Sequence, residues 1–321
     1  SLSADGSIAA MIVECLLCSP WNCVAVYQYD RDFYQYDRDF SLENWKQIGS
    51  MIYNNYRYCS NFKDLVSLSS DGLTIAIGTQ SGEQENAHII VLAYDGNKWV
   101  PVGSQIEVDG STHILSMVLS SDGLVVAITV GSQQDRYVYL YKNNEGTWHK
   151  IGSGITVDMK MNCVSLSLSS DGSIVAIGSP SDNGGHVRIF EHKENLWKQI
   201  GTQIGSDNGE DSCWSISLSS DGLTIAIGPY TKDGFEFWGE TPGSVLIFQF
   251  KEDAWDQMGD KITGPSDNMV TYTHSLYLST DASILGFWEV GWEVGSKVYF
   301  VVMQNRDGVW VQLGRSIPAG N

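Results

Sequence analysis

The chain has 321 residues, of which 42% are hydrophobic and 18% are charged. This composition excludes an intrinsically disordered chain, because it supplies enough apolar side chains for a core. The 38 acidic residues outnumber the 19 lysines and arginines and give a net charge of −19. Such a surface repels phosphate backbones and anionic lipid, so we expect no nucleic-acid partner. The longest apolar runs are far shorter than the roughly 20 residues of a membrane span, so we expect no span.

Two motifs recur along the chain at intervals of about 50 residues, which is typical of a repeat architecture. The first is a Ser-Ser-Asp-Gly turn followed by an apolar strand, and it is best preserved at 67–78 and 217–228. Its aspartates are Asp5, Asp71, Asp122, Asp171, Asp221 and Asp281. The second motif is Trp-x-x-φ-Gly, where φ is apolar, and it begins at Trp45, Trp99, Trp148, Trp197, Trp255 and Trp310. The two motifs keep step, so the chain contains six units.

Each unit has the pattern of four short strands. Apolar and polar residues alternate in 164–168, which is typical of a β-strand, and Ser-Asp-Gly then turns the chain into a second strand. A third strand, such as 187–190, and a fourth strand that carries the Trp complete the unit. We predict an all-β protein, a six-bladed β-propeller of four-stranded antiparallel blades. We expect each Trp to lie on the outermost strand and to cover the edge of its own blade.

The repeat also defines the predicted domain. We expect a single β-propeller domain over residues 1–321, with blades at 1–52, 53–106, 107–155, 156–204, 205–262 and 263–317. The chain begins inside a first strand and stops on the linker that would lead to another unit. A closed ring of six blades and a segment of a longer chain are both consistent with this register, and we favour closure.

The units resemble FG-GAP repeats, the type found in the integrin α-chain propeller and in tandem in algal and bacterial surface proteins. The GAP part is matched at 177–180 and 227–229, and the Val-x-φ-aromatic part at 187–190 and 245–248. The resemblance covers nearly the whole chain and implies a propeller at a cell surface. Integrin-like blades often carry an Asp-x-Asp-x-Asp-Gly calcium loop, whereas each turn here supplies one carboxylate. We therefore expect no calcium and no other cofactor.

Function on a repeat scaffold usually lies where one unit departs from the others. The loop 230–243 of the fifth unit is the longest of its kind, and it contains Phe235, Phe237 and Trp238 among acidic residues. These aromatic side chains suit stacking on a sugar ring or anchoring a neighbouring subunit. The alternative is a loop folded over its own blade.

The first unit has its extra length between the third strand and Trp45. There the segment 27–33 is repeated without change as 34–40, which predicts a lengthened hairpin. Its aromatic side chains would form an amphipathic ribbon suited to contact with another chain, and they are Tyr27, Tyr29, Phe33, Tyr34, Tyr36 and Phe40. The alternative is a tandem duplication without a role.

Candidate catalytic, metal-binding and disulfide-forming residues are few. Cys15, Cys18 and Cys23 are clustered, which allows a local disulfide. The chain has no Cys-x-x-Cys…Cys-x-x-Cys pattern and no Cys/His spacing of the zinc-site type. His113 and His274 lie near the start of the first strand in their units, but no repeated carboxylate, Cys or His joins them. We therefore predict no metal site, no catalytic residues and no enzyme.

These observations favour a non-enzymatic extracellular or cell-surface protein, a structural propeller subunit of an array or filament. Its expected partners are further copies of itself or other surface proteins. The alternative is a propeller module whose ligand is either a carbohydrate, that is a glycan, or a protein. An enzyme acting on polysaccharide is the third interpretation, and its weakness is the lack of paired acid and base groups.

Overall fold

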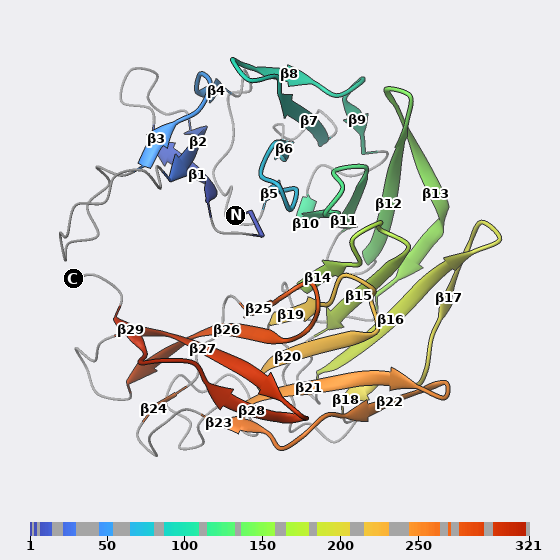
Figure 1. Cartoon of the computed structure of the whole chain (residues 1–321). Coiled ribbons are helices and arrows are strands. Elements are labelled where there is room, and N and C mark those ends of the chain that lie inside the picture. The colour runs from blue at the N-terminus through green and yellow to red at the C-terminus, as the bar shows by residue number, and fades with distance from the viewer. Residues whose placement is uncertain are drawn as a thin grey trace. The chain divides into compact units, whose positions relative to one another are not determined.

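The computed structural model describes the chain apart from residues 2, 5–6, 15–21, 30–44, 54–64, 80–86, 109–113, 132–135, 158–164, 180–184, 206–214, 231–243, 264–268, 271–275, 292–297 and 319–321. The described residues form β-strands and turns without a helix (Figure 1). The chain divides into two compact units. Unit 1 comprises residues 1–132 and 137–154, and unit 2 comprises 133–136 and 155–321.

Unit 1 holds three antiparallel sheets, each of which is one blade, except that Arg136, Ile155 and Thr156 of the third sheet belong to unit 2. Blade 1 has β1 (Ile8–Glu14), β2 (Asn22–Tyr29), β3 (Trp45–Gln47) and β4 (Ile52–Tyr53); blade 2 has β5 (Val66–Leu68), β6 (Thr74–Thr79), β7 (His88–Tyr94), β8 (Trp99–Pro101) and β9 (Ile106–Glu107); blade 3 has β10 (Ile114–Leu119), β11 (Val125–Gly131), β12 (Arg136–Asn144) and β13 (Thr147–Thr156). In blade 1, Ser1 supplies the innermost pairing, since its nitrogen and carbonyl oxygen bond to Ala10 at 3.1 and 2.9 Å.

Unit 2 holds the other three blades, built on the same strand order. Blade 4 has β14 (Ser165–Leu168), β15 (Ile174–Ser179), β16 (His186–Lys193), β17 (Leu196–Gln199) and β18 (Ile204–Gly205); blade 5 has β19 (Ser215–Leu218), β20 (Thr224–Tyr230), β21 (Ser244–Lys251), β22 (Ala254–Gln257) and β23 (Ile262–Thr263); blade 6 has β24 (Met269–Val270), β25 (Leu276–Leu278), β26 (Ile284–Gly291), β27 (Val298–Arg306), β28 (Val309–Gln312) and β29 (Ile317–Pro318). The prediction of an all-β propeller with six blades of four antiparallel strands is confirmed.

The second strand of a blade is buried on both faces. In blade 5, Ile225 and Ile227 pack into a cluster with side chains of blade 4, whereas Ala226 between them packs with Leu285 and Phe287 of blade 6. Alternate residues of a strand point to opposite faces, so one short apolar run serves two neighbouring blades at once. This double burial explains why these strands are continuous apolar runs.

The serines of the first strand join one blade to the next. The Ser67 hydroxyl accepts a hydrogen bond from the Leu119 amide at 2.9 Å, and the Ser217 hydroxyl accepts one from the Leu278 amide at 3.0 Å. Ser1 and Ser167 make the same contact with Leu68 and Leu218. A small side chain allows close approach, and its oxygen also satisfies an amide that would otherwise lack an acceptor. Each of these serines lies four residues before the turn Asp, and in blades 3 and 6 the residue at that position is Val118 or Tyr277.

The tryptophans also act between blades. The indole N–H groups of Trp99, Trp148 and Trp255 donate to the carbonyl oxygens of Ile48, Val102 and Ile200 at 3.2, 2.8 and 3.0 Å. Each acceptor is the φ residue of the preceding Trp-x-x-φ-Gly motif. The expected place of Trp on the outermost strand is confirmed, and the indole also bonds to the preceding blade. The indole spans two blades because its N–H needs a buried acceptor.

Glycine ends the motif for a steric reason. At Gly201 the backbone φ is +67°, and a Cβ atom built there would lie 2.6 Å from Cδ1 of Trp255. The site therefore requires both a left-handed backbone and the absence of a side chain.

The turn aspartates organise the Ser-Ser-Asp-Gly hairpins. Oδ1 of Asp281 accepts hydrogen bonds from the Ser279 hydroxyl at 2.7 Å and from the amide and hydroxyl of Ser283 at 3.0 and 2.8 Å. The same bonds from a serine hydroxyl and from a backbone amide recur at Asp71, Asp122, Asp171 and Asp221. The hydrogen bonds from Ser279, followed by those from Ser283, lower the pKa of Asp281 to about 2. These carboxylates are therefore local turn-forming groups.

A first prediction concerns the motif glycine. Gly201→Ala should lower the free energy of unfolding by about 1–3 kcal/mol more than Gly308→Ala, because only the first alanine overlaps an indole. Gly308 also has a positive φ, +88°, but its Cβ position is open. The backbone strain of about 1–2 kcal/mol is thus common to both variants. Urea unfolding of the two proteins measures the difference, and equal losses would contradict the assigned role of Trp255.

A second prediction concerns pH. The pKa of Asp281 is lower in the folded protein than its ordinary value of 3.8, so its charged form stabilises the fold above that value. Asp281→Asn should therefore destabilise the protein at neutral pH, and the difference from the wild type should shrink as the pH falls from about 4 to about 2. Unfolding curves at several pH values test this. In a Ser279→Ala background the pH-dependent part should be smaller, and an unchanged part would refute the assignment.

Candidate functional site

The aromatic residues expected at an interface are described only in part. Tyr27 is half-buried on β2, and Tyr29 is exposed there with its ring edge-on to that of Trp45, 5.4 Å between centroids. The residues between these two strands, 30–44, include Phe33, Tyr34, Tyr36 and Phe40 and lie outside the described residues, as do Phe235, Phe237 and Trp238. An interface role for these aromatics stays a prediction.

The cysteine and histidine predictions are likewise untested. Cys23 is buried on β2, where it pairs in register with Val13 of β1 and Tyr53 of β4. Cys15, Cys18, His113 and His274 lie outside the described residues. In the part of the chain that the structure describes, no group of three or more His, Cys, Asp or Glu side chains could hold a metal ion.

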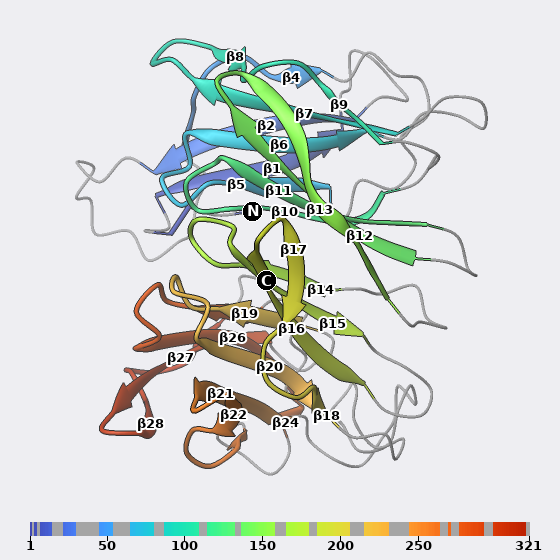
Figure 2. The ribbon, with the colours of Figure 1, turned by 90° about the vertical axis from the view of Figure 1, so that its right-hand side faces the viewer.

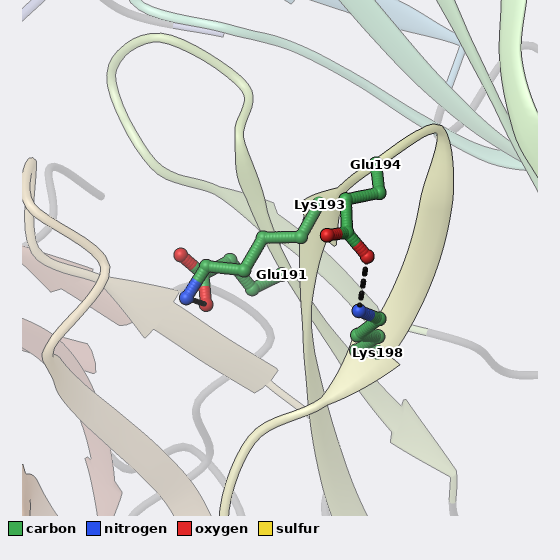
Figure 3. A network of polar contacts seen from close by, with 4 residues as sticks. All are labelled: Glu191, Lys193, Glu194 and Lys198. Atoms are coloured by element: carbon green, nitrogen blue, oxygen red, sulfur yellow. Dashed lines mark hydrogen bonds and ion pairs between the residues drawn. The ribbon is translucent and has the colours of Figure 1, made fainter.

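Exposed ion pairs near the outer hairpin of blade 4 are a first candidate. Lys193 pairs with Glu191 at 2.7 Å, and Lys198 pairs with Glu194 at 2.9 Å (Figure 3). All four side chains are substantially exposed, so each pair contributes at most about 1 kcal/mol. Their charges compensate one another, and they do not form a binding site.

A stronger candidate lies at the other end of β16, the strand that carries Glu191 and Lys193. β15 and β16 are neighbouring strands of blade 4 (Figure 2). β15 ends at Ser179 and β16 begins at His186, and these residues are direct partners in the antiparallel register. Side chains of direct partners lie on one face of the sheet. Arg188, two residues after His186, shares that face. A hydroxyl, an imidazole and a guanidinium are thus side by side on one blade, and we name Ser179, His186 and Arg188 the blade 4 cluster.

Two polar atoms of the blade 4 cluster are buried without a hydrogen-bond partner. Ser179 is 0% exposed, and neither its hydroxyl nor Nε of Arg188 has a partner among the described residues. The other end of the guanidinium is held, since a terminal nitrogen of Arg188 donates to the carbonyl oxygen of Thr156 at 2.9 Å. Each unpartnered buried polar group costs about 1–3 kcal/mol, so two neighbouring ones require an explanation.

A second arginine approaches the same segment of the chain. Arg136 is 5% exposed, and its carbonyl oxygen accepts a hydrogen bond from the amide of Val157, the residue after Thr156. A buried arginine is rare in a globular protein. Arg136 reaches this segment through its backbone, so Arg188 is the arginine whose guanidinium is shown to contact it.

Comparison along the repeat shows what is special about blade 4. The position of Arg188 is held by Ile90 in blade 2 and Leu246 in blade 5. Blade 2 has the equivalent hydroxyl and imidazole in Thr79 and His88, but there the Thr79 hydroxyl donates to the His88 carbonyl oxygen at 2.9 Å. The unsatisfied donors and the positive charge are thus combined in blade 4.

The sequence analysis missed the blade 4 cluster. It treated 177–180 and 187–190 as framework motifs and looked for function in the loop lengths. The signal was present, because Val187-Arg188-Ile189-Phe190 places a cation where the matching Val245-Leu246-Ile247-Phe248 has leucine.

No protein-family model and no curated protein matches the chain. Solved structures do match. A proposed 6-phosphogluconolactonase from Bacteroides fragilis is 15% identical with a TM-score of 0.58, covering 99% of this chain and 83% of the other. A periplasmic gluconolactonase from Pseudomonas aeruginosa is 13% identical with a TM-score of 0.57, covering 99% and 85%. The β-propeller domain of the trilobed protease from Pyrococcus furiosus is 12% identical with a TM-score of 0.56, covering 97% and 82%.

These likenesses establish the β-propeller fold and correct the functional expectation. A structural array or filament subunit was expected because no catalytic motif recurs along the chain. The similar propellers include a periplasmic gluconolactonase and a proposed 6-phosphogluconolactonase, so a propeller of this kind can also be that of an enzyme. Catalytic side chains do not have to recur, because a propeller can take one from a single blade. The FG-GAP type itself has no family model in support. Among the described residues, no helix has the length and apolarity that a membrane crossing requires.

Proposed function

We propose that the protein is a hydrolase that opens the lactone ring of a sugar acid at the blade 4 cluster. The observation that carries the proposal is the cross-strand pair of Ser179 and His186 with Arg188 on the same face. The likeness of the whole chain to two lactonase propellers supports the reaction class.

Lactone hydrolysis needs few groups from the protein. A base removes a proton from water as its oxygen adds to the lactone carbonyl, and the ring C–O bond then breaks while the ring oxygen takes up a proton. His186 is half-buried, and a histidine can perform both proton transfers near neutral pH. The positive charge of Arg188 favours the negative charge that develops on the carbonyl oxygen.

We also propose a location in the cell envelope or outside the cell. The periplasmic gluconolactonase is similar in fold, and the FG-GAP resemblance of the 177–190 region points to surface proteins. Immunolabelling of intact and permeabilised cells would test the location.

A third prediction follows for turnover. The purified protein should accelerate the hydrolysis of glucono-1,5-lactone or its 6-phosphate above the spontaneous rate. His186→Ser, which places the residue of blade 5 in blade 4, should lower kcat/KM by about 100-fold or more, the usual contribution of a general base. A pH-indicator assay corrected for spontaneous hydrolysis measures both effects.

The matched control is a histidine on the same strand. His192, at the far end of β16, packs on Trp197 and occupies a position held by Tyr94 and Phe250 in other blades. His192→Phe should keep full activity. If no lactone is hydrolysed, or if His186→Ser is as active as His192→Phe, the proposal is wrong.

A further inference from the structure

We infer that the blade 4 cluster binds an oxyanion, either a phosphate group of the substrate or the carboxylate of the sugar acid. The inference rests on the proposed function only in taking the ligand to be a sugar derivative, since the donors that carry it are observed in the structure. It assigns the chemical group that Ser179 and Arg188 contact.

The first step is the count of donors and acceptors. The Ser179 hydroxyl and Nε of Arg188 are both buried without a partner among the described residues. Nε of arginine can only donate, and a hydroxyl donates one hydrogen bond. Two unsatisfied donors call for one acceptor between them, and an anionic oxygen is the strongest acceptor available.

The second step is geometry. Ser179 is the register partner of His186, whereas Ile177 is the partner of Arg188. Ser179 and Arg188 are therefore diagonal neighbours on the same face, within reach of a group of the size of a carboxylate or phosphate. The bond from Arg188 to the Thr156 carbonyl oxygen holds the guanidinium while leaving Nε to a ligand.

The third step is the comparison with blade 2. Thr79 and His88 repeat the hydroxyl and imidazole, but Ile90 replaces the arginine and the hydroxyl is satisfied by the backbone. Where the cation is missing, the hydroxyl has an internal partner. The unsatisfied hydroxyl thus accompanies the arginine, which is the pattern expected of an anion site.

The fourth step shows that the overall charge of the protein does not attract the anion. The net charge of −19 repels anions at long range, so binding depends on directed donors. This allows a control matched in charge. Arg306 is exposed on β27 and bonds to Gln304 at 3.2 Å, and Arg306→Leu removes the same charge elsewhere in unit 2.

The experiment is isothermal titration calorimetry of the wild-type protein with inorganic phosphate and, separately, with gluconate. At least one anion should bind: binding of phosphate indicates a phosphate group on the substrate, whereas binding of gluconate alone indicates the carboxylate that hydrolysis forms. Arg188→Leu, which carries the residue of blade 5, should weaken binding at least tenfold, whereas Arg306→Leu should change it less than twofold. Arg188→Lys keeps the charge but lacks Nε–H, so it should also bind more weakly than the wild type.

A second measurement guards against a variant that does not fold. In the wild-type protein, the NMR signal of the Arg188 Nε–H should shift as phosphate or gluconate is added. Ser179→Val, which introduces the residue that blade 3 has at this position (Val130), should also bind the anion more weakly than the wild type, whereas Arg306→Leu should not. Absence of binding of both anions, or equal binding by Arg188→Leu and Arg306→Leu, would overturn the inference.

The two proposals can fail separately. Anion binding without lactone hydrolysis would leave the oxyanion site and remove the proposed function. Hydrolysis of neutral glucono-1,5-lactone with no binding of either anion would support the proposed function and remove the oxyanion site.

Discussion

The hydrogen bonds that pass from one blade to the next are the constraint on which this structure depends. The innermost strand of a blade would leave amides without acceptors, and the serine of the preceding blade supplies the oxygen, as Ser67 does for Leu119 and Ser217 for Leu278. At the outer edge the indole N–H is satisfied in the same direction, as Trp255 shows with Ile200. Because a buried unpaired amide costs about 1–3 kcal/mol, neither motif can vary freely.

This constraint determines where chemistry can occur. Residues such as Ile225, Ala226 and Ile227 are fully buried between neighbouring blades, so they have no freedom to acquire a function. The ends of these strands differ more from blade to blade. There the same register holds Thr79 and His88 in blade 2 and Ser179 and His186 in blade 4, with an arginine added in blade 4. A function can thus be confined to one blade while the other blades remain scaffold.

Sequence patterns predicted the scaffold well and the site poorly, for one physical reason. Strand alternation, turn residues and the Trp register are repeated six times, so packing rules reveal them. The blade 4 cluster departs from a framework motif: Arg188 stands where Leu246 stands in blade 5. The hydroxyl of Ser179 is notable only because no described residue is its hydrogen-bond partner. Whether a hydroxyl is satisfied depends on the fold and cannot be inferred from spacing. The sequence analysis therefore looked to the long aromatic segments, whose role stays a prediction.

The strongly acidic composition is compatible with an anion site, because attraction to directed donors and repulsion by the net charge act over different distances. Burial lowers the local dielectric, so a guanidinium and a hydroxyl aimed at one oxyanion act strongly at short range. At longer range the net charge of −19 opposes anions. Opening a lactone creates one additional carboxylate, so the product carries more negative charge than the substrate. Under the proposed function, the surrounding field therefore disfavours the product more than the substrate, so the long-range repulsion promotes product release and opposes the short-range binding proposed at Ser179 and Arg188.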